Sequence, residues 1–208
     1  MNKSEKFWDK QAKGFTDQEQ HTQLSENKDF ITTLKYLNTD DMVLDYGCAT
    51  GIISNAIADK VKEIHAIDIS PKMIEIAKSK ANERNIENIH YAPATIYDER
   101  YQKESFNVIL AFRILHMLED IEAVIRRINE LLKPGGTFIS VSACMGDKKS
   151  FLGILVFLAS KLRIVPLHIN LFKLTELQGI ISNGGFEIVE HEKMDDKVLH
   201  YCIVARKL

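Results

Sequence analysis

The sequence lacks the features that mark several large classes of protein. Its 208 residues include three cysteines, Cys48, Cys144 and Cys202, without Cys-x-x-Cys spacing, which argues against a disulfide framework and a zinc site. A large excess of charge of one sign is also missing, because the sequence has 27 Lys and Arg residues and 29 Asp and Glu residues. This near balance gives no electrostatic footprint for nucleic acid. Residues 1–14 are charged and hold no apolar core of a secretory signal, so a cytoplasmic enzyme with a small-molecule partner is expected.

Long hydrophobic runs are absent as well. A membrane-spanning helix needs about 18 or more apolar residues, and the most apolar stretch, residues 151–165, is shorter. A helix that is apolar on every side must be buried against something. Three interpretations of this stretch stay open: a core helix, a lid over a pocket for an apolar substrate, or a contact with a membrane surface or a second copy of the chain.

What the sequence does contain is a glycine-bearing turn near its front. The apolar run that begins at Val43 ends in a carboxylate, Asp45, and Gly47 and Gly51 follow before a helix-compatible segment, 52–60. This pattern predicts a buried strand, a tight turn and the start of a helix. Glycine allows positive φ and lets a ligand approach the main chain closely, and the first N–H groups of the next helix have no partner within it.

Some ligands fit this turn poorly. The dinucleotide fingerprint needs glycine where Ala49 and Ile52 stand, so a nicotinamide oxidoreductase on a related sheet is disfavoured. A phosphate-binding P-loop needs a Gly-Lys-Ser/Thr sequence, and the turn has no such lysine. Asp45 would repel a pyrophosphate and attract a cation. An ammonium or a sulfonium group therefore suits the turn better than a phosphate.

These residues resemble the first motif of the class I S-adenosylmethionine (SAM) dependent methyltransferases, which reads roughly Asp-x-Gly-x-Gly-x-Gly. Asp45, Gly47 and Gly51 match that motif, and Ala49 takes the place of its middle glycine. The resemblance implies SAM as the cofactor and S-adenosylhomocysteine as its product. It also implies that the turn lies over the methionine part of SAM, where Tyr46 would close over it.

A second acid ends the next apolar run, 64–68. Asp68 lies 23 positions after Asp45, a spacing typical of one strand-helix-strand unit. The resemblance implies that Asp68 accepts hydrogen bonds from both ribose hydroxyls of SAM. The alternative is a helix start, in which Ser70 or Asp68 caps a helix that begins at Pro71. Both roles hold together if Ser70 is the cap.

The same resemblance implies the rest of the cofactor site. The family commonly offers an acid to the adenine where this chain has Ala94, Thr95 and Ile96, so the Thr95 hydroxyl or the backbone would replace it and Ile96 would pack on the ring. Carbonyls near Ala111 would hold the ammonium. The cofactor-binding residues expected in this way are Asp45, Tyr46, Gly47, Cys48, Gly51, Asp68, Ile69, Met73, Ala94, Thr95, Ile96, Ala111 and Phe112.

The strand predicted at 106–112 resembles the family's fourth motif, whose end faces the methyl-transfer centre. It lacks the Asp/Asn-Pro-Pro-aromatic sequence of enzymes that methylate amino groups of nucleic-acid bases. It also lacks the acid that metal-dependent catechol-type enzymes bring to this edge, so no metal is predicted. His116 follows the strand on that side and titrates near neutral pH, which makes it the candidate catalytic base. The alternative is a histidine that packs in the core or on a helix surface.

At the level of fold, the resemblance implies one α/β domain over residues 1–208. It would be a Rossmann-like, doubly wound sheet of seven strands with the last strand antiparallel and helices on both faces. A Lys-Pro-Gly-Gly sequence at 133–136, between a predicted helix and a predicted strand over 137–143, is a second match to the family. Alternating segments at 186–192 and 198–206 predict the closing hairpin.

Two further segments are expected to cover the site. Residues 1–26 would form an N-terminal flap, and residues 147–172 a small helical lid inserted after the fifth strand. The expected function is methyl transfer from SAM to a small, rather apolar acceptor. The alternative is a non-catalytic SAM-binding or regulatory protein on the same fold, because the sequence offers no clear catalytic base.

Overall fold

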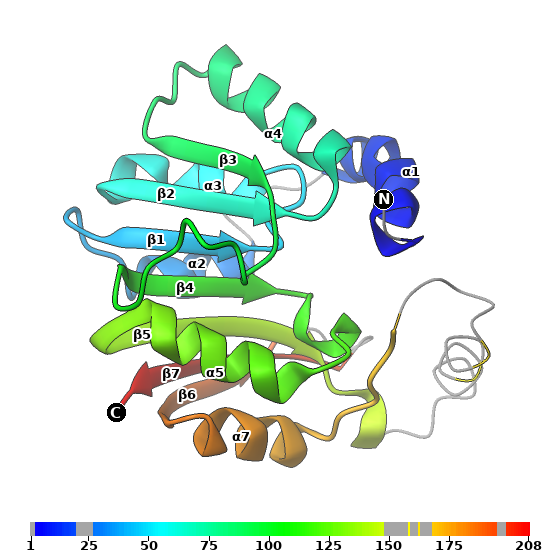
Figure 1. Cartoon of the computed structure of the whole chain (residues 1–208), viewed down its shortest axis with the longest axis vertical. Coiled ribbons are helices and arrows are strands. Elements are labelled where there is room, and N and C mark those ends of the chain that lie inside the picture. Colours follow the sequence, from blue (N-terminus) through cyan, green and yellow to red (C-terminus); the bar gives the residue numbers. More distant parts are fainter. Residues whose placement is uncertain (1–2, 20–26, 148–157, 159–161, 163–167, 195–198) are drawn as a thin grey trace.

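The computed structural model of the chain describes residues 3–19, 27–147, 158, 162, 168–194 and 199–208. Within them, seven strands form one sheet in the order β3-β2-β1-β4-β5-β7-β6 (Figure 1). Neighbouring strands are parallel except around β7, which runs antiparallel to β5 and to β6. The predicted doubly wound sheet with an antiparallel last strand is confirmed. The strands are β1 (Met42–Tyr46), β2 (Glu63–Asp68), β3 (Ile89–Pro93), β4 (Phe106–Phe112), β5 (Leu132–Ala143), β6 (Phe186–Lys193) and β7 (His200–Lys207).

Helices cover both faces of this sheet. Residues Val43 and Leu44 are neighbours in β1 but belong to different hydrophobic clusters, because successive side chains of a strand point to opposite faces. The cluster of Leu44 includes Ile125 of α5, and the cluster of Val43 includes Ile57 of α3. The helices are α1 (Lys3–Glu19), α2 (Lys28–Leu34), α3 (Ile52–Ile57), α4 (Pro71–Glu83), α5 (Ile121–Leu131) and α7 (Leu174–Asn183), with short 3₁₀ helices η2 (Ala58–Lys60), η3 (Leu115–Met117) and η4 (Met145–Asp147).

The strand order reverses between β1 and β4. From β1 the chain adds β2 and β3 on one side, and then returns to place β4 on the other. In open α/β sheets the crevice at the carboxyl ends of two such strands is the usual ligand site. Asp45, near the end of β1, pairs with Leu110 of β4 and with Ala66 of β2. The acid-led turn therefore lies at this crevice.

The Lys-Pro-Gly-Gly sequence differs from its prediction. It was expected to separate a helix from a strand over 137–143, but β5 begins at Leu132 and contains it. The pairing with β4 steps from Phe106–Leu132 to Val108–Thr137, so the four residues form an irregularity within the strand. A Cβ on Gly136 would lie 3.0 Å from the Asn107 carbonyl oxygen. Glycine at this position therefore lets β5 return to regular pairing with β4.

The predicted N-terminal flap, residues 1–26, contains the helix α1. This helix continues to Glu19, and residues 20–26 lie outside the described part. The lid prediction, 147–172, and its apolar core, 151–165, also lie largely outside it, apart from residues 147, 158, 162 and 168–172. No helix in the described part of the chain is long and apolar enough to cross a bilayer.

Candidate functional site

A cavity of about 460 Å³ opens at the carboxyl ends of β1, β2 and β4, at the edge of the sheet where α1 lies (Figure 1). A cavity of this size suits a small-molecule ligand. We call its two parts the turn half and the β4 half. The turn half is lined by Asp45, Tyr46, Gly47, Cys48, Ala49, Ile52, Ile53, Asp68, Ile69 and Met73, with Ser4, Trp8 and Phe15 from α1. The β4 half is lined by Asn27, Asp29, Phe112, Arg113, Ile114, His116, Met117, Leu118 and His200.

The turn after β1 bends sharply enough to need glycine twice. Gly47, Ala49 and Gly51 have φ of +81°, +48° and +76°. A Cβ on Gly47 would lie 2.8 Å from Cδ1 of Ile114, and a Cβ on Gly51 would collide with the Tyr91 hydroxyl. Both glycines are thus required by conformation and by close packing. Ala49 holds the same left-handed conformation with a side chain, which strains its backbone.

The N–H groups of this turn serve the neighbouring strand. Those of Gly47 and Cys48 both donate to the Ile67 carbonyl, at 2.8 and 3.0 Å, and that of Ala49 donates to Oδ2 of Asp68 at 3.1 Å. These three groups hold the ends of β1 and β2 together, and they are distinct from the first N–H groups of α3, which were expected to face a ligand. The turn therefore contributes to the site in two ways: its glycines leave the backbone without side chains, and its hydrogen bonds hold Asp45 and Asp68 in position.

Asp45 is the acid beneath the turn. Its carboxylate is 3% exposed and accepts a hydrogen bond of 2.5 Å from the Ser54 hydroxyl of α3. Burial raises the pKa of Asp45 to about 6, and the negative charge of Asp68 adds to the shift, while the Ser54 hydrogen bond opposes it. A cation in the cavity would relieve that penalty by stabilising the charged carboxylate.

Asp68 ends β2 and is held by backbone donors. Its Oδ1 accepts from the Ser70 N–H at 2.9 Å, and its Oδ2 accepts from Ala49 as above. Burial raises the pKa of Asp68, against the effect of these hydrogen bonds. The Ile69 N–H also donates to this carboxylate. A carboxylate has about four acceptor sites, so Asp68 can still accept from a further donor, such as a hydroxyl in the cavity. The Ser70 hydroxyl accepts from the Met73 N–H at 3.2 Å, so Ser70 is the cap of α4, as predicted.

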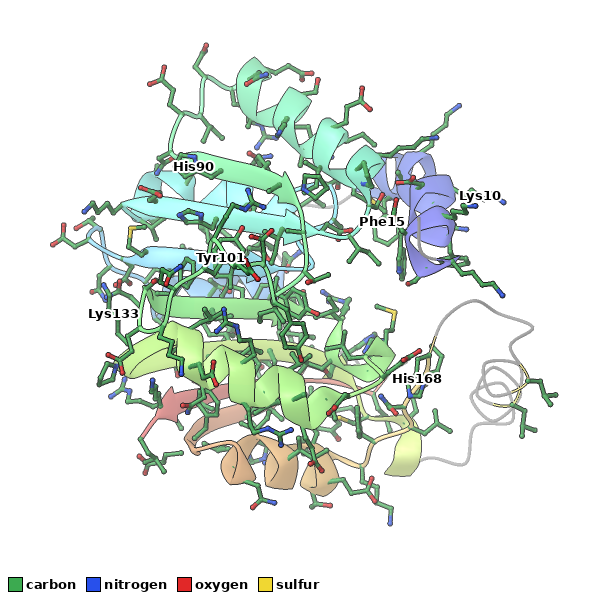
Figure 2. All side chains as sticks on the ribbon, viewed as in Figure 1. Lys10, Phe15, His90, Tyr101, Lys133 and His168 are labelled. Carbon is green, nitrogen blue, oxygen red and sulfur yellow. The ribbon has the colours of Figure 1, made fainter. Side chains whose placement is uncertain are left out.

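The helix α1 supplies the aromatic wall of the turn half. Trp8 contacts Phe7 and Phe15 edge-on, with ring centroids 5.2 and 6.0 Å apart. Phe15 lies on the side of α1 that faces the strand ends, whereas Lys10 points into solvent (Figure 2). Trp8 and Phe15 thus give the α1 side of the cavity an apolar surface.

The β4 half contains polar residues that the sequence analysis missed. Arg113 follows β4 with φ of +57° and forms an ion pair with Asp29, which is 3% exposed. Asp29 and Asn27 come from the start of α2, far away in the sequence. No short-range pattern marks them, because Asp29 has the sequence signature of an ordinary first-turn acid. Only the fold brings it to the cavity.

His116, the candidate base, lies on η3 in this half. Its Nδ1 is buried and has no hydrogen-bond partner in the described part of the chain. Burial lowers the pKa of His116 to about 4, and His200 and Arg113 add to the shift. The imidazole is therefore neutral at neutral pH. Its backbone carbonyl accepts from the Asn170 N–H at 2.7 Å, and the Asn170 side chain donates to the Leu118 carbonyl at 2.7 Å.

The structure gathers most of the predicted site residues and leaves some out. Five of them do not line the cavity: Gly51, Ala94, Thr95, Ile96 and Ala111. Gly51 is the N-cap of α3, and Ala111 is fully buried within β4. Ile96 is fully buried in the cluster beneath α5, so it is not placed to pack on an adenine ring. The lining does include Asp45, Tyr46, Gly47, Cys48, Asp68, Ile69, Met73, Phe112 and His116. The described residues contain no group of His, Cys, Asp and Glu side chains placed to hold a metal ion.

Three features together define a class I SAM-dependent methyltransferase fold. The mostly parallel sheet reverses its strand order, an acid-led glycine turn lies at the switch point, and the next strand ends in an acid. The comparison with known families agrees. A model described as a methyltransferase domain matches residues 37–201, and the chain belongs to this family.

Individual relatives fit the same assignment. The chain is 28% identical over 146 residues to a ubiquinone biosynthesis O-methyltransferase from Shewanella, covering 68% of this chain and 61% of that protein. It thus spans less than two thirds of that relative. A SAM-dependent methyltransferase from Methanosarcina mazei has a TM-score of 0.71 at 20% identity, covering 85% of this chain and 97% of the other. The [4+2]-cyclase SpnF has a TM-score of 0.72 at 17% identity, covering 86% and 79%.

Proposed function

We propose that the protein transfers the methyl group of SAM to an oxygen atom of a small, rather apolar molecule and releases S-adenosylhomocysteine. One observation carries this proposal. Two acids, the buried Asp45 and the partly buried Asp68, flank a glycine turn at the switch point of a chain that belongs to the methyltransferase domain family. Such a pair favours a ligand that brings both a positive charge and hydroxyl donors.

The turn half suits this cofactor. When bound, SAM would supply a methyl group that its positively charged sulfur already activates. Asp68 would accept from the ribose hydroxyls through the lone pairs that its backbone donors leave free. Asp45 lies deeper, where its carboxylate attracts the positive charge of the methionine part. Trp8 and Phe15 would exclude water from the far side.

The β4 half suits an acceptor with a hydroxyl group on an apolar body. Phe112, Ile114, Met117 and Leu118 provide apolar walls, and the neutral imidazole of His116 lies among them. As the acceptor oxygen forms its bond to the methyl carbon and the carbon–sulfur bond breaks, the hydroxyl proton would pass to His116. Support for oxygen as the acceptor atom comes from the O-methyltransferase named above.

The inserted segment begins and ends beside this half. The Gly146 N–H donates to the Phe172 carbonyl at 2.8 Å, so the two ends of the insertion meet. Asn170 ties the returning end to the backbone of His116 and Leu118. The predicted lid between these two ends, with its apolar residues 151–165, lies largely outside the described residues.

The experiment is calorimetric titration of SAM into the wild type and into Asp68→Ala. Loss of the two ribose hydrogen bonds should weaken binding by about 2–4 kcal/mol, taking each charge-assisted bond at about 1.5–3 kcal/mol less the local rearrangement. Asp59→Ala, an exposed acid on η2, is the matched control and should bind like the wild type. Equal dissociation constants for all three proteins would remove Asp68 from the site.

A non-catalytic SAM-binding protein is the second candidate. The observation that favours it concerns His116. Among the described residues, its Nδ1 has no carboxylate or carbonyl partner of the kind that usually orients a catalytic histidine. The likeness to a cyclase also indicates that this fold is not confined to methyl transfer. Incubating the protein with methyl-labelled SAM and fractionated cell extract separates the two. Labelled product supports the enzyme, whereas tight SAM binding without product in any fraction supports the binding protein.

A further inference from the structure

The carboxylate of Asp9 reaches from α1 to the start of α4. Its Oδ1 accepts a hydrogen bond of 2.6 Å from the Ser70 hydroxyl and a longer one, 3.3 Å, from the Lys72 N–H. An acid at the N-terminus of a helix is stabilised there by the unpaired N–H groups and the helix dipole. This contact therefore attaches α1 to the body of the protein at a favourable point.

Ser70 links this contact to the cavity. It is fully buried, its hydroxyl donates to Asp9 while accepting from Met73, and its N–H donates to Oδ1 of Asp68. One residue thus connects the aromatic helix, the first turn of α4 and the acid at the end of β2. The charge of Asp9 also adds to the effect of burial in raising the pKa of Asp68. Asp68 and Asp9 are therefore connected by two consecutive hydrogen bonds, both made by Ser70.

Asp9 shares α1 with the aromatic side chains of the cavity. Trp8 precedes it directly, and Phe15 lies six positions further along the helix, nearly two turns away. Movement of α1 away from α4 would open the side of the cavity that lies between these rings and Asp68. The Asp9–Ser70 hydrogen bond opposes this movement.

We propose that Asp9 is a positioning residue that latches α1 over the cofactor cavity and, through Ser70, holds Asp68 in its ligand-binding orientation. The latch regulates entry and exit of the adenosyl ligand at the site proposed above, and in that respect it rests on the proposed function. The attachment of α1 to α4 does not rest on the proposed function, because the hydrogen bonds of Asp9 that form it are within the protein. The two claims therefore have separate measurements.

The first measurement is made without ligand. Trp8 is the only tryptophan of the chain, so its fluorescence reports on α1 alone. Asp9→Ala should increase quenching of Trp8 by acrylamide, and Asp59→Ala, the exposed acid used above, should leave it unchanged. Asp9→Asn keeps an oxygen that can accept from Ser70 and should fall between them. Equal quenching in all four proteins, wild type included, would overturn the latch.

The second measurement is stopped-flow release of S-adenosylhomocysteine, followed by Trp8 fluorescence. Asp9→Ala should speed release by about tenfold, the factor that corresponds to about 1.4 kcal/mol and so to one net charge-assisted hydrogen bond. In a Ser70→Ala background, adding Asp9→Ala should change the rate little, because its partner is already gone. Full additivity would overturn coupling through Ser70. If the wild type binds no S-adenosylhomocysteine, the proposed function fails, and the quenching result alone decides the latch.

Discussion

At the scale of single residues, the site depends on two carboxylates that are withdrawn from bulk water, Asp45 fully and Asp68 in part. Asp45 accepts a hydrogen bond from the Ser54 hydroxyl, and Asp68 accepts hydrogen bonds from backbone N–H groups. Neither acid has a basic side chain among the hydrogen-bond partners that the structure gives it. The protein therefore keeps buried negative charge for a ligand to neutralise, which a purely structural network would avoid.

This arrangement predicts a pH-dependent gain in stability for Asp45→Asn. The folded pKa of Asp45 is about 6, against about 3.9 in an unfolded chain. A raised acid pKa means that ionised Asp45 destabilises the empty protein at pH values above about 6, and the penalty disappears as the pH falls below about 4. The Asn variant, whose side-chain oxygen can still accept from Ser54, should resist urea better than the wild type at about pH 7.5.

The test compares urea midpoints of the wild type and Asp45→Asn at about pH 7.5 and about pH 4. The difference should shrink at the lower pH, where the wild-type carboxyl is protonated. Asp59→Asn, an exposed acid, should show no such difference at either pH. An Asp45→Asn variant that is less stable than the wild type by the same amount at both pH values would contradict the account.

At the scale of elements, sequence patterns predicted most of what the structure contains. The apolar runs at 106–112 and 64–68 are β4 and most of β2, and Ser70 before Pro71 is the start of α4. Errors fell where tertiary pairing overrides local signals. Lys133–Gly136 has the composition of a turn, but pairing of Leu132 with Phe106 draws it into β5.

The turn after β1 gives an element-scale prediction. Ala49 has φ of +48°, and a left-handed conformation destabilises a residue with a Cβ by about 1–2 kcal/mol relative to glycine. Part of that gain is lost because glycine makes the unfolded chain more flexible. Ala49→Gly should therefore raise the free energy of unfolding by roughly 0.5–1 kcal/mol.

Urea denaturation measures this change, with Ala123→Gly as the control. Ala123 lies in the first turn of α5, where its N–H donates to the Asp120 side chain, so the same substitution there should lower the free energy of unfolding, by up to about 1 kcal/mol. If both variants were destabilised alike, the backbone of Ala49 would not be strained, and the turn would not need glycine-like geometry at its centre.

At the scale of the whole molecule, sequence alone could predict the fold and the turn half of the site. Asp45 and Asp68 belong to short motifs at strand ends, and parallel strands bring their carboxyl ends to one edge. The β4 half could not be predicted in this way. Asp29 and Arg113 are 84 positions apart, and His200 enters from β7. The adenine residues were placed by resemblance alone, and the core position of Ile96 depends on how α5 packs.

The most direct test of the central claim is a crystal structure of the protein with S-adenosylhomocysteine bound. We expect its ribose hydroxyls on the Asp68 carboxylate, its methionine part over the turn from Gly47 to Gly51, and Trp8 and Phe15 against its exposed side. Density that leaves this cavity empty while the ligand binds elsewhere, or that places a ligand there through phosphate groups, would contradict the account.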